Sequence, residues 1–217
     1  DSASLAGAAL YIAVAVVMPF LLLAQLLLKT GGSAFFSDIS LAVAGRSRGG
    51  SAKIAILGSA LFGSVSGSAV SNVASTGAIT IPLMKDGGYA PKTAAAIEAS
   101  ASTGGQLMPP IMGASAFLLA ENLQVAYGDV VLAALIPSLL FYVALYAFAS
   151  LEAGRRGIKA VDPARIPAAH AVLTKGWFVI VPFAVLLTGL FGFNLRPETA
   201  ALYAVLSLFL LSLFRTY

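Results

Sequence analysis

Residues 61–72, LFGSVSGSAVSN, bring glycine, serine and asparagine together inside one of the most apolar parts of the chain. Serine hydroxyls, and backbone carbonyls released from helix hydrogen bonds, are the oxygen ligands that hard cations prefer. The N-terminus of a helix at the same place would present a positive dipole end to an anion. A break in the helix here would therefore create a site for an ion or a charged solute.

A second polar interruption, STGGQLMPP at residues 102–110, lies in another apolar run. Its paired glycines and paired prolines lower helix propensity and remove backbone donors, which frees carbonyls around 102–106. Polar residues recur every four positions beside both interruptions, and this spacing places them on one helix face. These residues are Ser68, Asn72, Thr76 and Thr80 in the first run, and Glu98, Ser102 and Gln106 in the second. The pattern predicts an enclosed polar site between two broken elements.

The elements that position these residues belong to a membrane protein. The chain has 217 residues, of which 59% are hydrophobic and 10% charged, whereas soluble domains carry about 25% charged residues. Alternating strand patterns are absent, so helices are the expected spanning elements. The sequence predicts an all-α integral membrane fold, with apolar runs at 5–28, 52–84, 92–123, 130–151, 176–194 and 198–214.

The distribution of charge predicts the sidedness of these runs. Basic residues gather before and after run 52–84 and again between 151 and 176, while the connection between 123 and 130 has no Lys or Arg. The positive-inside rule places the basic connections in the cytoplasm. Run 52–84 must then enter and leave on one face, so we predict a re-entrant helical hairpin with its tip at residues 64–68. Each arm of about 14–16 residues is shorter than the ~30 Å core of a bilayer. The alternative is one long tilted helix kinked at its glycines, which breaks the charge rule.

Composition also excludes several kinds of site. The chain has no cysteine and a single histidine, His170, so disulfides, thiol chemistry and zinc sites are unsupported. No basic patch with interleaved aromatic residues suggests nucleic acid. The motif Gly63-Ser-Val-Ser-Gly67 is also a G-x-x-x-G, which allows close helix packing without any ligand.

Two segments together resemble a known family. GSVSGSAVSNVASTGAITIPLMKDGGY followed by EASASTGGQLMPPIMGASAFLLAE is similar to the large membrane subunit of the tripartite ATP-independent periplasmic (TRAP) transporters, and most like the fused-permease branch served by TAXI-type binding proteins. The resemblance implies half of an inverted-repeat elevator transporter in a bacterial or archaeal inner membrane. It also implies import of small organic anions, driven by sodium and delivered by a periplasmic solute-binding protein.

The resemblance assigns candidate residues as well. It implies a sodium ion between the hairpin tip and the following broken helix, held by Ser66, Gly67, Ser68, Ser102, Thr103 and Gly104. Substrate is expected close by, and the candidate substrate-facing residues are Asn72, Thr76, Glu98, Gln106 and Pro109. The chain departs from many relatives in having Ala69-Val70 after Ser-Gly-Ser, and Ile111 after Pro110.

On this interpretation residues 1–155 form a first transport repeat, with a helix at 5–28, the hairpin at 52–84, a broken helix at 92–123 and a helix at 130–151. Residues 156–175 form a cytoplasmic connection, and residues 176–217 form two helices that begin a second half. We expect the chain to be a piece of a longer polypeptide whose remaining half and small-subunit-like helices are its partners, together with the lipid bilayer.

Two other functions are open. A channel or structural helix bundle would use the glycines for packing alone. An intramembrane serine protease would need a base, yet no G-x-S-x-G is present and His170 lies in a predicted loop. The sequence therefore favours a transporter over an enzyme.

Overall fold

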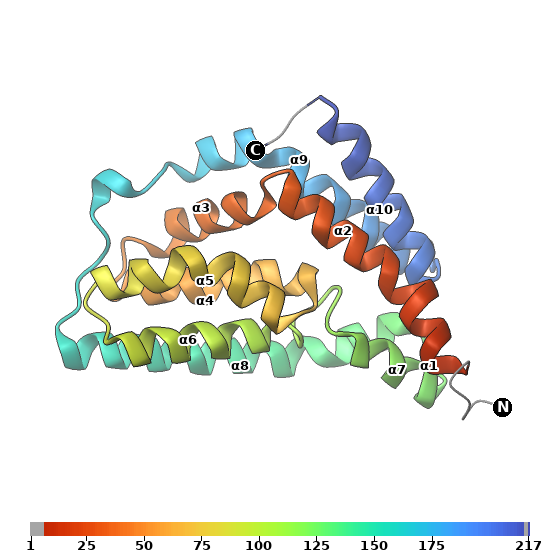
Figure 1. Cartoon of the computed structure of the whole chain (residues 1–217), viewed down its shortest axis with the longest axis horizontal. Helices are drawn as coiled ribbons and strands as arrows, with labels where there is room; N and C mark the ends of the chain where they lie inside the picture. The colour runs from red at the N-terminus through yellow and green to blue at the C-terminus, as the bar shows by residue number, and fades with distance from the viewer. Residues whose placement is uncertain (1–6, 215–216) are drawn as a thin grey trace.

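The computed structural model of the chain describes residues 7–214 and 217. Every regular element in those residues is helical, which confirms the predicted all-α fold (Figure 1). In chain order the elements are α1 (Ala8–Tyr11), η1 (Ile12–Val17), α2 (Met18–Lys29), α3 (Gly32–Ala44), α4 (Gly50–Ser66), α5 (Ala69–Asp86), α6 (Pro91–Gly104), α7 (Ala114–Leu123), α8 (Tyr127–Arg156), η2 (Pro163–Arg165), α9 (Ala169–Leu187), η3 (Thr188–Gly192) and α10 (Pro197–Ser212).

The described residues include three helical stretches that are long and apolar enough to cross a membrane, namely Ile12–Lys29, Tyr127–Arg156 and Pro163–Gly192. On α8, a stripe of large apolar side chains faces outward. Ile136, Leu140 and Val143 lie at helical spacing and are 68%, 63% and 64% exposed. An exposed apolar stripe of this kind suits contact with lipid.

The hairpin forms from α4 and α5, which pack side by side (Figure 1). The predicted tip spans residues 64–68, but helix α4 continues through Ser66 and only Gly67 and Ser68 are non-helical. Gly67 takes a left-handed conformation with φ of 59°, which favours glycine. Ser68 is extended and caps α5, because its Oγ accepts a hydrogen bond from the backbone N–H of Ser71 at 3.3 Å.

The predicted broken helix at 92–123 forms as α6 and α7, with residues 105–113 between them. A buried core of small residues packs α6 against α4 and α8, including Ala55, Ala94, Ala101 and Ala149. Small side chains let helix backbones approach closely. This packing holds α6 next to the hairpin.

One helix differs from the expected arrangement. The sequence predicts no apolar run between residues 28 and 52, whereas the structure forms α3 there. This helix is 13 residues long and is interrupted by Ser37, Asp38 and Ser40, so it lacks the long apolar run that marks a span. Its buried face, including Phe35 and Phe36, packs in the larger core with α2 and α9.

The first helix in the last third of the chain, α9, also begins earlier than expected. The sequence predicts a connection at 156–175 and a helix from 176, but α9 begins at Ala169. Its backbone kinks at Gly176, where an added Cβ would overlap the ring of Phe35. Helix α9 continues through η3 and packs on α10, which also packs on α2. The first predicted helix, 5–28, is observed from Ala8 to Lys29, and residues 5 and 6 lie outside the described residues.

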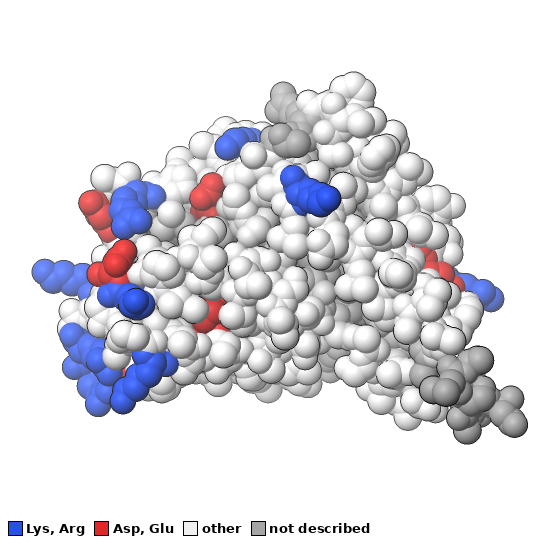
Figure 2. Space-filling view, viewed as in Figure 1, with Lys and Arg blue, Asp and Glu red and all other residues white. Residues whose placement is uncertain are grey.

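Basic side chains gather at one end of the molecule (Figure 2). The connections α3–α4 and α5–α6 and the end of α8 all lie at this end (Figure 1). Arg46 and Arg48 lie in the first connection, Lys85 and Lys92 lie in the helix turns that flank the second, and Arg155 and Arg156 end α8. The turn between α2 and α3, where Lys29 lies, is away from this end (Figure 1).

Candidate functional site

The hairpin break leaves backbone oxygen atoms without helix partners. The last four carbonyls of an α-helix have no intrahelical donor. In α4, the carbonyl of Gly63 accepts from Gly67 N–H at 3.0 Å, and that of Ser64 accepts from Ile111 N–H at 3.1 Å. Within the described part of the chain, no backbone N–H donates to the carbonyls of Val65 or Ser66. The carbonyl of Gly67 likewise has no backbone donor among the described residues, so the tip presents oxygen atoms that are free of backbone hydrogen bonds.

The tip lies directly against the interruption between α6 and α7. The hydrogen bond from Ile111 to Ser64 joins the two segments, and a Cβ on Gly67 would overlap the carbonyl oxygen of Met112. Likewise, a Cβ on Gly63 would lie 2.5 Å from the Cα of Gly105. The two predicted breaks are therefore in backbone contact, and glycine is required where they meet.

Most of the carbonyls of residues 102–106, at the second break, accept backbone hydrogen bonds. The carbonyls of Thr103 and Gly104 accept from the N–H groups of Gln106 and Leu107, at 3.1 and 2.9 Å. For the carbonyl of Ser102, by contrast, residues 7–214 and 217 supply no backbone donor. Its hydroxyl points elsewhere, since it donates to Glu98 Oε1 at 3.3 Å. The hydroxyl of Thr103 is bonded to the carbonyl of Ala99 on an exposed face.

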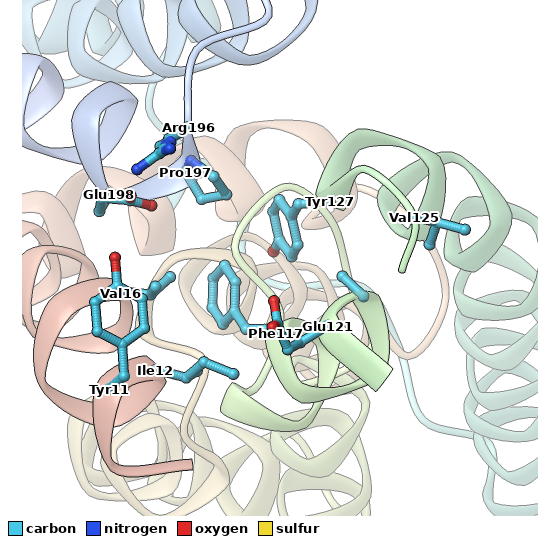
Figure 3. A pocket seen from close by; sticks show the side chains of 11 residues that line it. Tyr11, Ile12, Val16, Phe117, Glu121, Val125, Tyr127, Arg196, Pro197 and Glu198 are labelled. Carbon is cyan, nitrogen blue, oxygen red and sulfur yellow. The ribbon is translucent and has the colours of Figure 1, made fainter. Parts of the chain in front are cut away.

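Tyr127, at the start of α8, fixes the loop that meets the tip. Its hydroxyl donates to the carbonyls of Pro110 at 3.0 Å and Ile111 at 2.5 Å, and its ring stacks on Phe117 with 4.3 Å between centroids. Tyr127 and Phe117 also line a cavity of ≈ 300 Å³ (Figure 3). Charged residues from α7 and the start of α10, Glu121, Arg196 and Glu198, line the same cavity.

A buried polar network lies behind the tip, centred on Glu98 of α6. This side chain is fully buried, and so are Ser59, Asn72, Thr76 and Ser102. Ser59 and Thr76 donate to Glu98 Oε1 at 2.9 and 2.6 Å. Asn72 Nδ2 donates to the carbonyl of Ser59 at 2.8 Å. The network joins α4, α5 and α6.

The predicted substrate-facing residues therefore fall into two groups. Asn72, Thr76 and Glu98 are enclosed between helices. Thr76 lies within hydrogen-bond distance of both Glu98 and Asn72, and Asn72 donates to the carbonyl of Ser59. Gln106 is exposed and lines an apolar cavity of ≈ 690 Å³ between α7 and α8, and Pro109 is half-buried. Gly104, one of the predicted sodium-site residues, is buried against Phe141 and Tyr142.

The sequence predictions do not include two residues of the site, Ser59 and Tyr127. Ser59 shares a helix face with Gly63 and Ser66, at spacings of four and three, and this small-residue face is the signal that would identify it. Tyr127 stands in a connection that the sequence treats only as a boundary between runs. Its contact with residue 111 is made across the fold, so no local pattern indicates it.

An all-helical chain with apolar spans and two interrupted helices in contact is an integral membrane protein built like a transporter. Residues 3–217 match the family described as "Tripartite ATP-independent periplasmic transporter, DctM component". The chain belongs to this family. Its members are multi-pass permeases of the inner membrane and not enzymes, which agrees with the apolar helices described above.

Several characterised relatives are similar over most of the chain. A C4-dicarboxylate TRAP transporter large permease protein of Pseudomonas aeruginosa is 31% identical over 194 residues, which are 88% of this chain and 45% of that protein. An isethionate TRAP transporter permease of Oleidesulfovibrio alaskensis is 31% identical over 86% of this chain and 29% of its own length. A sialic acid TRAP transporter permease of Haemophilus influenzae is 27% identical over 87% of this chain and 31% of its own. The chain thus spans less than half of each of these relatives.

Proposed function

We propose that this chain is the part of a sodium-coupled permease that holds the first ion site and closes one side of the substrate path. The permease would import small organic anions delivered by a periplasmic solute-binding protein of the TAXI type. Two further parts would complete the permease. One is the remaining portion of a chain as long as the relatives, and the other is a set of small-subunit-like helices. The relatives named for C4-dicarboxylate, isethionate and sialic acid transport support an anionic substrate.

The observation that carries this proposal is the backbone contact between the two helix breaks. Unpaired carbonyls in a bilayer are tolerated only inside protein or beside a polar cavity, because each costs several kcal/mol in hydrocarbon. The carbonyls of Val65, Ser66 and Ser102 lie next to this contact and lack backbone donors within the described residues. Oxygen atoms of this kind suit a hard cation such as sodium.

We place the sodium ion between the tip and the end of α6, as the family resemblance implies. The tip residues of this site are Ser66, Gly67 and Ser68, and the opposing ones are Ser102, Thr103 and Gly104. Backbone oxygens are the preferred ligands on the α6 side, since the hydroxyls of Ser102 and Thr103 are bonded away from the tip.

Substrate contact is proposed for the open side of the break. Gln106 and Pro109 are accessible there, and Gln106 lines the larger cavity. Asn72, Thr76 and Glu98 are enclosed, so they would act on substrate indirectly by fixing the hairpin against α6. An anion near the tip would also be favoured by the N-terminus of α5, which begins at Ala69.

Transport in proteoliposomes tests the proposal. Full-length protein, reconstituted with its binding protein, should accumulate a radiolabelled organic anion under an inward sodium gradient but not under a potassium gradient. The probes are succinate, isethionate and sialic acid, each tested separately. Ser66→Ala combined with Ser68→Ala should raise the sodium concentration for half-maximal uptake by about tenfold.

Ser75→Ala is the matched control, because Ser75 lies on the same hairpin and its hydroxyl bonds only to the carbonyl of Ser71 at 2.8 Å. It should leave uptake unchanged. Equal uptake under potassium would contradict sodium coupling. A tip variant with unchanged sodium dependence would show that the hydroxyls of Ser66 and Ser68 do not hold the ion.

A further inference from the structure

Lys53, in the first turn of α4, is a buried cation without an anionic partner in the described part of the chain. The residue is 7% exposed. Its Nζ lies 4.7 Å from the centroid of the Tyr146 ring on α8, in a cation–π contact. Among residues 7–214 and 217, the ion pairs formed are those of Glu152 with Arg155 and Arg156, and none involves Lys53. Because a buried charge is costly unless it is paired, this position favours an anion.

An apolar groove runs between α4 and α8 from the place where this ammonium group lies. The groove has a volume of ≈ 360 Å³, and the ring that Lys53 contacts, Tyr146, belongs to its lining. From α4 it is lined by Ile56, Leu57 and Ala60. These residues follow Lys53 by three, four and seven positions, so all four share one face of α4. The cation therefore lies at one end of a stripe of apolar side chains.

The groove opens onto the surface of α8 that suits contact with lipid. Val143 lines the groove and also belongs to the exposed apolar stripe with Ile136 and Leu140. Leu139, which lines the groove as well, is exposed in the same way. A hydrocarbon chain in the bilayer can thus enter the groove from the side, and its burial against this lining is favourable.

The position and length of the groove fit one leaflet of a membrane. Helix α4 begins at the end of the molecule where basic side chains gather (Figures 1 and 2), and the positive-inside rule places that end in the cytoplasm. From Lys53 to Ala60 the helix rises about 10 Å at 1.5 Å per residue. One leaflet contributes about 15 Å to a hydrocarbon core of ~30 Å. The ammonium group is therefore at the level of lipid headgroups, and the apolar lining is at the level of acyl chains.

A second cation lies farther toward the basic end. The guanidinium group of Arg48 packs on the end of α8, where a Cβ built on Gly154 would lie 2.8 Å from Nη2. Gly154 is eight residues beyond Tyr146 on α8, so it lies on the same helix face. The carboxylate between them, Glu152, is already paired with two arginines. This end of the groove is therefore positively charged, which favours an anionic phospholipid over a zwitterionic one.

We propose that Lys53 and the groove between α4 and α8 bind one anionic phospholipid of the cytoplasmic leaflet. The lipid phosphate accepts hydrogen bonds from the Lys53 ammonium group, and part of one acyl chain occupies the groove. Basic pockets between membrane helices on the cytoplasmic side are typical sites for phospholipid headgroups. The bound lipid would contact the first arm of the hairpin and α8 together. The proposal goes beyond the proposed transport function and does not depend on it.

Counting bound lipid tests the site without any transport assay. Delipidated full-length protein in detergent is titrated with dioleoyl phosphatidylglycerol or with dioleoyl phosphatidylcholine, and native mass spectrometry counts the bound lipids. The wild type should bind one phosphatidylglycerol at least fivefold more tightly than phosphatidylcholine, which is about the effect of one basic residue near a membrane surface. Equal binding of the two lipids would overturn the proposal.

Variants of Lys53 test the headgroup contact. Lys53→Met keeps most of the apolar stem but removes the charge, so it should weaken the binding of phosphatidylglycerol by about fivefold. Lys53→Arg keeps the charge and should stay within twofold of the wild type. Lys92→Met is the matched control, because it removes an exposed lysine at the start of α6, outside the groove lining. It should also stay within twofold of the wild type.

Two exposed alanines of α8 test the acyl-chain contact. Ala147 lines the groove and Ala144 does not. Ala147→Trp fills the groove and should weaken the binding of phosphatidylglycerol at least as much as Lys53→Met does. Ala144→Trp adds the same side chain to the same helix outside the groove and should bind like the wild type. Thermal unfolding of each variant in detergent checks that it is folded.

The remaining portion of a chain as long as the relatives is the other candidate to cover this groove. In that case Lys53→Met and Ala147→Trp would both bind phosphatidylglycerol like the wild type, and the lipid site would be wrong. A loss in Lys53→Met without a loss in Ala147→Trp would overturn the groove as the place of the acyl chain. Lipid binding is measured here without a sodium gradient, so a failure of sodium-coupled uptake would leave the result unaffected.

Discussion

At the scale of single residues, Tyr127 connects three parts of the site through one side chain. Its hydroxyl bonds to the carbonyls of Pro110 and Ile111. The backbone N–H of Ile111 in turn donates to the carbonyl of Ser64 near the tip. Tyr127→Phe keeps the stacking on Phe117 but leaves the buried carbonyl of Ile111 and the half-buried carbonyl of Pro110 without this donor. We expect the free energy of unfolding to fall by about 1–2 kcal/mol, measured by thermal unfolding in detergent.

Tyr203→Phe provides the comparison for Tyr127→Phe, because Tyr203 is 54% exposed on α10. It should unfold like the wild type. Equal stability of both variants would show that the hydroxyl of Tyr127 does not hold the loop.

The residues of the polar network show how far the sequence predicts a site. Spacing alone places Asn72, Thr76 and Thr80 on one face, and Glu98 and Ser102 on another. The structure brings these two faces together around Glu98. The sequence does not predict Ser59 as the third participant, because helical periodicity orders residues within a helix and does not specify which neighbouring helix faces them.

At the scale of elements, one close approach between the hairpin and the second break depends on two glycines. A Cβ on Gly63 would lie 2.5 Å from the backbone of Gly105, so Gly63→Ala must push the segments apart. Overpacking of this kind typically destabilises a protein by about 1–3 kcal/mol. We expect a lower thermal unfolding midpoint and a weaker sodium dependence of uptake.

Gly58→Ala is the matched control on the same helix, where the nearest atom to an added Cβ is Ser40 Oγ at 3.6 Å. Because alanine favours helix over glycine, this variant should be as stable as the wild type or slightly more stable. If Gly63→Ala behaves like Gly58→Ala, the backbone contact is not needed.

Elements are predictable from the sequence where the chemistry is local. Glycine and proline mark both helix breaks, and Gly67 takes a positive φ at the first of them. Helix α3 lacks a prediction because it is short and polar in places, and because it is stabilised by packing against α9 through Phe35 and Phe36. Such tertiary contacts leave no signal in a window of its own residues.

At the scale of the whole molecule, the ends of the hairpin decide how it lies in the membrane. The α3–α4 and α5–α6 connections lie at the same end of the molecule, where basic side chains gather (Figures 1 and 2). Helices α4 and α5 have 17 and 18 residues, or about 26–27 Å each at 1.5 Å per residue. An antiparallel pair of this length returns to the face it entered, whereas a single kinked helix would cross.

Cysteine labelling distinguishes these arrangements, because the chain itself has no cysteine. In a cysteine-free background, Arg46→Cys and Asp86→Cys flank the hairpin, and Asn122→Cys lies near the end of α7; all three positions are exposed. A membrane-impermeant maleimide should reach the first two only in inside-out vesicles, and the third only in right-side-out vesicles. Labelling of positions 46 and 86 from opposite sides would instead mean that α4 and α5 cross the bilayer as a single kinked span. The tip would then not meet the second break inside the membrane, and the proposed ion site would lose its enclosure.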